Sequence, residues 1–239
     1  MSALTKAMVL AAGRGVRMRP LTNDKPKALV SLCGETLLDR ALNRCRDAGV
    51  TSIAVNAHYK GELIRSHLGE SPDIQLSWED ELLETGGGVC KALPLLGSGP
   101  FFVINCDSIW FDGSQSALSR LGDAWREDEM DALLLLQPIK KAVGYSGNGD
   151  FSRNDTGRIQ RRGKQAVAPF VFMGVQVLHP RLFADEKVRP FSLNRLYDRA
   201  LALNRLFGVV HDGAWYHVGT PEDLAIANKA FNKPKNGSP

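Results

Sequence analysis

The chain has no paired cysteines, no long apolar run and no large excess of charge of one sign. Its four cysteines, Cys33, Cys45, Cys90 and Cys106, are widely spaced and form no C-x-x-C pair, so neither a zinc site nor a thioredoxin-type motif is readable. We therefore expect reduced thiols and a cytoplasmic protein. The first apolar run breaks at Gly13, too early for a signal peptide or a membrane span, so we expect a buried strand and no membrane association.

Charge and composition are close to the average of globular proteins. The 30 Lys and Arg residues against 26 Asp and Glu residues leave a net charge of +4, which is too small to predict a nucleic-acid partner. With 239 residues, 44% hydrophobic and 23% charged, the chain is long and apolar enough to bury a core. A mostly disordered chain and a small disulfide scaffold are excluded.

Short apolar runs alternate with helical patterns, which is typical of an α/β fold with a mostly parallel central sheet flanked by helices. Buried strands are expected at Ala7–Ala12, Ser52–Asn56, Phe101–Asn105, Ala132–Gln137 and Phe170–Leu178. Helices are expected at Thr36–Ala48, Gly61–Leu68, Gly87–Leu96, Ser116–Arg126, Ser192–Asn204 and Pro221–Phe231, with a short hairpin around Asp212–Gly213.

No repeat or long linker divides the chain, so we predict one domain over residues 1–231. Residues 140–169 are rich in Gly, Asn, Asp, Arg and Lys, which indicates an exposed insertion or hairpin that could act as a lid rather than core. Residues 232–239 are expected to form a flexible tail.

The first strand runs into a loop that combines glycines with arginines. Gly13 and Gly15 let several backbone N–H groups point at one spot, and Arg14, Arg17 and Arg19 add forked charged donors. This pattern favours a phosphate site over a plain turn with solvated arginines. It fits neither a P-loop nor a dinucleotide fingerprint, so a dehydrogenase is the least favoured function.

Three other spots allow a functional and a plain structural interpretation. Lys25 and Lys27 flank Pro26, and either lysine could simply be solvated. Asp107 ends an apolar strand, where it could hold Mg²⁺ against substrate phosphates or cap the next turn. The glycines Gly86–Gly88 could lie against a base or ribose, or could form an ordinary joint between loop and helix.

Taken together, the segments LAAGRGVRMRPLT, PKAL, LETGGG, NCD and WYHVGTP resemble the sugar-1-phosphate nucleotidyltransferases over nearly the whole chain. The resemblance implies a Rossmann-like nucleotidyltransferase fold and Mg²⁺-dependent transfer from a nucleoside triphosphate to a sugar 1-phosphate. The short length, LETGGG, the GDF of Gly149–Phe151 and GVQVLHP are most similar to the N-acetylmuramate 1-phosphate uridylyltransferases of cell-wall recycling. Mannose-1-phosphate guanylyltransferases are the alternative, and UTP is the favoured nucleotide.

The resemblance also implies roles for individual residues. The catalytic group is expected to comprise Arg17, Lys27 and Asp107, with Asp107 also a metal ligand. The nucleotide is expected to contact Ala11, Ala12, Gly13, Arg14, Gly15, Glu84, Thr85, Gly86, Gly87, Gly88 and Asn105. Asp150 and Gly174 are expected at the sugar.

One position departs from the family pattern W-x-D-x-G-T, because His217 stands where the second metal-binding aspartate is expected. Mg²⁺ prefers oxygen ligands, so His217 could instead hold a metal-bound water or be a structural histidine. The substitution is the best argument for a non-catalytic nucleotide-binding or sugar-phosphate-binding module. The joint presence of Arg17, Lys27 and Asp107 favours an enzyme. The sequence leaves the base, the sugar and the oligomeric state open.

Overall fold

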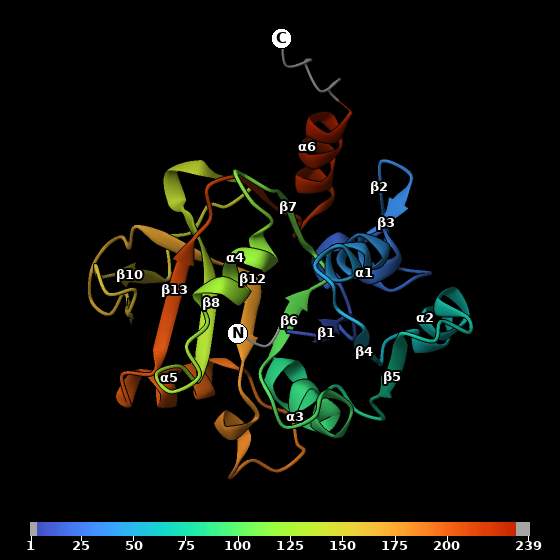
Figure 1. Cartoon of the computed structure of the whole chain (residues 1–239). Helices are drawn as coiled ribbons and strands as arrows, with labels where there is room; N and C mark the ends of the chain where they lie inside the picture. Colours follow the sequence, from blue (N-terminus) through green and yellow to red (C-terminus); the bar gives the residue numbers. More distant parts are fainter. Residues whose placement is uncertain (1–3, 233–239) are drawn as a thin grey trace.

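Alternating burial along the strands places two apolar cores on opposite faces of one nine-stranded sheet. Helices surround this central sheet (Figure 1). In the computed structural model, which describes residues 4–232, Ala7 and Val9 of β1 face one core and Met8 faces the other. Helices α1, α2 and α4 cover the first face, and α3 and α5 cover the second. The helices are α1 (Leu37–Asp47), α2 (Gly61–Leu68), α3 (Glu84–Leu96), α4 (Ala117–Ala124), α5 (Asn194–Ala202) and α6 (Pro221–Phe231).

Half of the sheet is parallel, in the order β6-β1-β4-β5. Strand β12 then runs antiparallel to both β6 and β8, and β13 lies parallel to β8. Strands β10 and β11 form a hairpin, and β10 pairs with the start of β12. The strands are β1 (Lys6–Leu10), β4 (Ser52–Ala57), β5 (Ile74–Trp78), β6 (Phe101–Asn105), β8 (Ala132–Pro138), β10 (Phe151–Arg153), β11 (Ile159–Arg161), β12 (Phe170–Leu178) and β13 (Leu206–Val210). The predicted α/β class is confirmed.

Two small sheets lie beside the main one. The first has the order β7-β14-β9 and the second pairs β2 with β3. Their strands are β2 (Ser31–Leu32), β3 (Glu35–Thr36), β7 (Ser108–Phe111), β9 (Ala142–Val143) and β14 (Ala214–His217). Short 3-10 turns are η1 (Val16–Met18), η2 (Lys27–Leu29), η3 (Ile139–Lys141) and η4 (Pro180–Phe183). Within the described residues, no helix is both long and apolar enough to span a bilayer.

Several local predictions are wrong, each because a distant contact decides the outcome. The turn at Asp212–Gly213 is not a hairpin, since β13 pairs with β8 in the main sheet while β14 pairs with β7 and β9 in the small one. Strand β1 stops at Leu10 because the N–H of Ala11 bonds to the Asn56 side chain instead of a neighbouring strand. Strands β5 and β7 were not predicted as strands.

The segment 140–169 is a hairpin around β10 and β11, but it is not wholly exposed. Phe151 and Ile159 are each 2% exposed and belong to the core that α3 and α5 cover. Two well-placed apolar residues are enough to dock a polar hairpin, which composition alone does not reveal. The predicted tail 232–239 lies outside the described residues apart from Asn232. All four cysteines are free.

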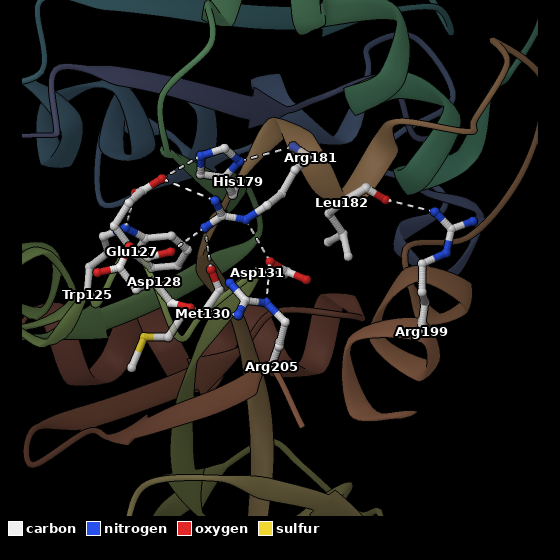
Figure 2. A network of polar contacts seen from close by, with 10 residues as sticks. All are labelled: Trp125, Glu127, Asp128, Met130, Asp131, His179, Arg181, Leu182, Arg199 and Arg205. Atoms are coloured by element: carbon white, nitrogen blue, oxygen red, sulfur yellow. Dashed lines mark hydrogen bonds and ion pairs between the residues drawn. The ribbon is translucent and has the colours of Figure 1, made fainter. Parts of the chain in front are cut away.

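A network of charged side chains links the start of β8, the end of β12 and the start of β13 (Figure 2). This edge of the sheet is opposite the one where β1 and β6 end at the glycine loop and Asp107. Asp131, just before β8, accepts from Arg181 Nε and Arg205 Nε, both at 2.8 Å. The carboxylate of Glu127 accepts from His179 at 2.7 Å and from Trp125 Nε1 at 2.9 Å. The Asp131 side chain is only 9% exposed, so Arg181 and Arg205 must compensate its negative charge in place of water.

Replacing Asp131 with asparagine keeps the shape but removes the negative charge between two guanidinium groups. We expect Asp131→Asn to lower the free energy of unfolding by about 2 kcal/mol, because the arginines are partly exposed and regain some hydration. Asp185→Asn is the control, since that carboxylate is 87% exposed and should change stability by less than about 0.5 kcal/mol. Urea unfolding of both variants measures the difference, and equal losses would contradict the role given to Asp131.

Candidate active site

The carboxyl ends of β1, β4 and β6 meet at a cavity of about 400 Å³. Ligands in open α/β sheets gather at this edge, beyond the carboxyl ends of parallel strands. The backbone after β1, the end of β4 and the end of β6 form one side, and residues around the start of α3 form the other. The lining residues are Leu10, Ala11, Ala12, Gly13, Lys27, Asn56, Leu82, Glu84, Thr85, Asn105, Cys106, Asp107 and Ser192.

The loop after β1 folds back onto Lys27. Gly15 has φ +59, and a Cβ there would lie 2.8 Å from Lys27 Cβ, so only glycine fits both the conformation and the contact. Thr22 Oγ1 donates to the Gly15 carbonyl at 2.8 Å, which closes the loop. Arg14 and Arg17 are exposed on its outer side, free to meet an anion.

Lys27, not Lys25, faces the cavity. Lys27 Nζ lies 2.5 Å from Asp107 Oδ2, whereas Lys25 is exposed on the far side of Pro26. Burial alone would raise the pKa of Asp107, but the Lys27 ammonium outweighs burial and holds that pKa below its usual value. The pair therefore places a full negative and a full positive charge at the end of β6.

His217 and Arg17 approach the same spot from opposite ends of the chain. A Cβ on Gly219 would lie 2.8 Å from His217 Nε2 and 3.2 Å from Arg17 Nη1. His217 pairs in register with Ser108, the residue after Asp107. Burial lowers the pKa of His217 and the nearby cations Lys27 and Arg17 lower it further, so the imidazole is neutral at pH 7.

Asp107 and His217 are two side chains that could contribute to a magnesium site. Among residues 4–232, no group of three or more His, Cys, Asp or Glu side chains could enclose an ion. Asp107 offers one carboxylate and His217 a nearby imidazole nitrogen. Mg²⁺ is commonly bound by one or two carboxylates plus substrate phosphates, so this donor set fits an ion shared with a polyphosphate.

The three glycines of LETGGG do not line the cavity. Glu84 and Thr85 do, and Glu84 adopts φ +58, an uncommon conformation for a residue with a side chain. The N–H groups of Gly86 and Gly87 donate to the Phe191 carbonyl at 2.8 and 3.2 Å. A Cβ on Gly87 would lie 2.1 Å from the Arg189 carbonyl oxygen. The glycines therefore make room for the segment before α5, which brings Ser192 to the cavity.

A buried polar pair that sequence reasoning missed connects the two sides of the cavity. Asn56 Oδ1 accepts from Ala11 N–H at 2.7 Å, and Asn56 Nδ2 donates to Glu79 Oε1 at 2.6 Å. Glu79 Oε2 accepts from Leu83 N–H at 3.0 Å. Asn56 and Glu79 are 2% and 1% exposed. The available signal was a polar residue at the end of the apolar strand SIAVN.

Gly174 and Asp150 mark a second part of the edge, beside β6. Gly174 has φ +76 where the register of β12 shifts, and a Cβ there would lie 2.8 Å from Asn105 Nδ2. Asp150 Oδ2 accepts from Phe172 N–H at 2.9 Å, two residues before Gly174. Asp150 thus lies across the free edge of β12 from Asn105, outside the main cavity.

Comparison with known proteins identifies a family and two similar sequences. Residues 7–146 match the MobA-like NTP transferase domain. The chain is 43% identical to an N-acetylmuramate alpha-1-phosphate uridylyltransferase of Caulobacter vibrioides, over 90% of this chain and 92% of that protein. It is 34% identical to the enzyme of that name from Neisseria meningitidis serogroup B, over 90% of this chain and 93% of that one.

Solved structures with little sequence similarity share the fold. A putative glucose-1-phosphate thymidylyltransferase from Bacillus anthracis superposes with a TM-score of 0.78 at 18% identity, covering 98% of this chain and 97% of that one. The predicted family is confirmed. The chain belongs to the sugar-1-phosphate nucleotidyltransferases, within the MobA-like NTP transferase domain family.

Proposed function

We propose that the chain transfers a uridylyl group from UTP to N-acetylmuramate 1-phosphate, with pyrophosphate as the second product. The observation that carries the proposal is the Lys27–Asp107 pair at 2.5 Å, placed where the glycine-arginine loop meets the end of β6. The choice of UTP and N-acetylmuramate rests on the names of the two relatives at 43% and 34% identity.

The reaction needs positioning and charge neutralisation rather than a base. An oxygen of the sugar 1-phosphate attacks the α-phosphorus of the nucleotide in line, and the bond to pyrophosphate breaks. The attacking phosphate is already ionised at neutral pH, so no proton must be removed. Lys27 would stabilise the charge on the reacting phosphates, and Arg17 would hold the β- and γ-phosphates.

Asp107 would hold a magnesium ion, which when bound neutralises charge on the nucleotide phosphates. His217, neutral and close to Arg17, would donate or accept a hydrogen bond at the same phosphates or at metal-bound water. Asn105 at the end of β6 and Gly174 behind it would shape the floor on which the sugar phosphate lies. Glu84 and Thr85 would meet the base.

A panel of substrates tests the proposal. Pyrophosphate release is measured with UTP, GTP, dTTP and CTP against the 1-phosphates of N-acetylmuramate, N-acetylglucosamine, mannose and glucose. We expect UTP with N-acetylmuramate 1-phosphate to give the highest kcat/KM. A preference for GTP and mannose 1-phosphate would overturn the choice of substrates. Absence of turnover with every pair would favour a non-catalytic binding module.

The two lysines beside Pro26 provide a matched pair of variants. Lys27→Ala should lower kcat by about 10²–10³-fold, because a charge beside the reacting phosphates is lost. Lys25→Ala should leave kcat within about twofold, since an exposed charge is screened by solvent and salt. Steady-state kinetics on both variants decides the assignment, and similar losses would show that general positive charge, not contact, matters.

Exchanging donor and acceptor tests whether the buried pair sets the width of the nucleotide cavity. Asn56→Asp sets two carboxylates in contact and should raise the KM for the nucleotide about tenfold, equivalent to about 1.4 kcal/mol. Adding Glu79→Gln to this variant should return the KM for the nucleotide to its wild-type value. The aspartate at position 56 still accepts from Ala11 N–H and from the new amide, whose oxygen still accepts from Leu83 N–H.

The KM for the sugar phosphate is the internal control in that experiment, and it should stay constant in all three proteins. Thermal unfolding of the same proteins separates a loss of stability from a loss of nucleotide affinity. Failure of the double variant to recover nucleotide affinity while it recovers stability would contradict a positioning role for the pair.

The histidine at the family's aspartate position has a distinct expected behaviour. A neutral imidazole adds no negative charge, so His217→Asp should lower the Mg²⁺ concentration needed for half-maximal turnover. His217→Ala should lose less activity than Asp107→Asn, because Asp107 carries a carboxylate and His217 does not. Turnover measured against Mg²⁺ concentration compares the four proteins. A wild-type protein that is inactive while His217→Asp is active would overturn the catalytic proposal.

A further inference from the structure

A second cavity, of about 210 Å³, lies at the hairpin of β10 and β11 and is not used by the mechanism above. It is lined by Gly149, Asp150, Arg161, Arg162 and Gly163. Its volume is several times the roughly 30 Å³ that a water molecule occupies in the liquid. The cavity therefore has room for a small substituent of a larger ligand.

Strand pairing places this cavity next to the sugar end of the site. On the edge of β12 that faces β6, Val175 is the register partner of Ile104. On the same edge, Phe170 is the register partner of Phe151 of the hairpin. Between these two pairings, the edge from Phe172 to Gly174 is bordered by Asn105 on one side and by Asp150 on the other. A sugar on the Asn105 floor would thus have the hairpin as its opposite wall.

The two arginines of this cavity differ in how they are held. Arg161 is committed to protein partners, with Nε 2.9 Å from Asp198 Oδ1 and Nη1 2.9 Å from Asn194 Oδ1. Arg162 uses Nη1 alone, for the carbonyls of Gln165 at 2.9 Å and Ala166 at 3.4 Å. No carboxylate of the described residues lies within 4.0 Å of the Arg162 guanidinium.

The hairpin also leaves space beside that guanidinium. Gly163 has φ +57, and a Cβ built there would have only the Arg161 carbonyl oxygen nearby, at 4.0 Å. Asp150 also lines the cavity, and its Oδ2 accepts from the Phe172 N–H at 2.9 Å. Arg162 is therefore a cation whose Nε and Nη2 edge has no partner among the described residues, in a cavity that two glycines help to line.

We propose that Arg162 binds the carboxylate of a lactyl substituent on the sugar, so that the cavity selects N-acetylmuramate over N-acetylglucosamine. The inference rests on the proposed function and extends it. The two sugars differ by one lactyl ether, whose carboxylate is ionised at neutral pH. The planar guanidinium presents two parallel N–H donors to such a group, which a neutral sugar cannot use.

The test compares the 1-phosphates of N-acetylmuramate and N-acetylglucosamine, with UTP, in the wild type, Arg162→Ala and Arg162→Lys. Arg162→Ala should lower kcat/KM for the muramate by about 10–100-fold, mainly through KM, and leave the glucosamine value within about twofold. For Arg162→Lys, the kcat/KM for the muramate should lie between the wild-type and Arg162→Ala values. Lysine keeps the positive charge but lacks the two parallel N–H donors of the guanidinium. Lys164→Ala removes an exposed charge two residues away and should leave the ratio of the two kcat/KM values unchanged.

A neutral substrate completes the experiment. The carboxamide of N-acetylmuramate 1-phosphate should be as poor a substrate for the wild type as the free acid is for Arg162→Ala, and the two losses should not add. Additive losses, or an unchanged ratio in Arg162→Ala, would overturn the role of Arg162 while leaving the proposed function intact. A wild type that does not prefer N-acetylmuramate 1-phosphate would overturn both.

Discussion

The Lys27–Asp107 ion pair is the contact on which the site depends, because it joins the loop after β1 to the end of β6. The loop can reach that position only because Gly15 lies against the Lys27 side chain. The pair also has a chemical consequence. A buried carboxylate would ordinarily gain a proton more readily, but the ammonium keeps Asp107 ionised and available to a cation. An arriving polyphosphate would compete for the same lysine.

Around this ion pair, two buried polar side chains hold the walls of the cavity in place. Asn56 and Glu79 use every oxygen and nitrogen of their side-chain ends on Ala11, Leu83 and each other. Gly88 permits the arrangement, since a Cβ there would lie 2.7 Å from Glu79 Oε1. These hydrogen bonds fix the wall of the cavity around Asn56, which limits the reorganisation needed on binding.

The sequence motifs located the site but did not predict which of their residues line the cavity and which pack against the rest of the protein. The glycine-arginine loop, Pro26 with its lysines, and Asp107 all lie at one edge, as the order of strands and helices implies. The LETGGG segment was expected at the base, yet only Glu84 and Thr85 reach the cavity. The glycines pack against protein, because the absence of a side chain permits close approach by any neighbour, whether a ligand or another segment.

By itself the sequence determined five strands of the main sheet, the class of fold and the family. Apolar runs such as Phe101–Asn105 are bounded by residues that end a strand, and local burial energy is sufficient to specify them. Only the tertiary structure decided that Lys27 forms a direct ion pair with Asp107, that β13 and β14 join different sheets, and that Asn56 bonds to Glu79. These are contacts between distant segments, and their partners depend on the path of the whole chain rather than on local preference.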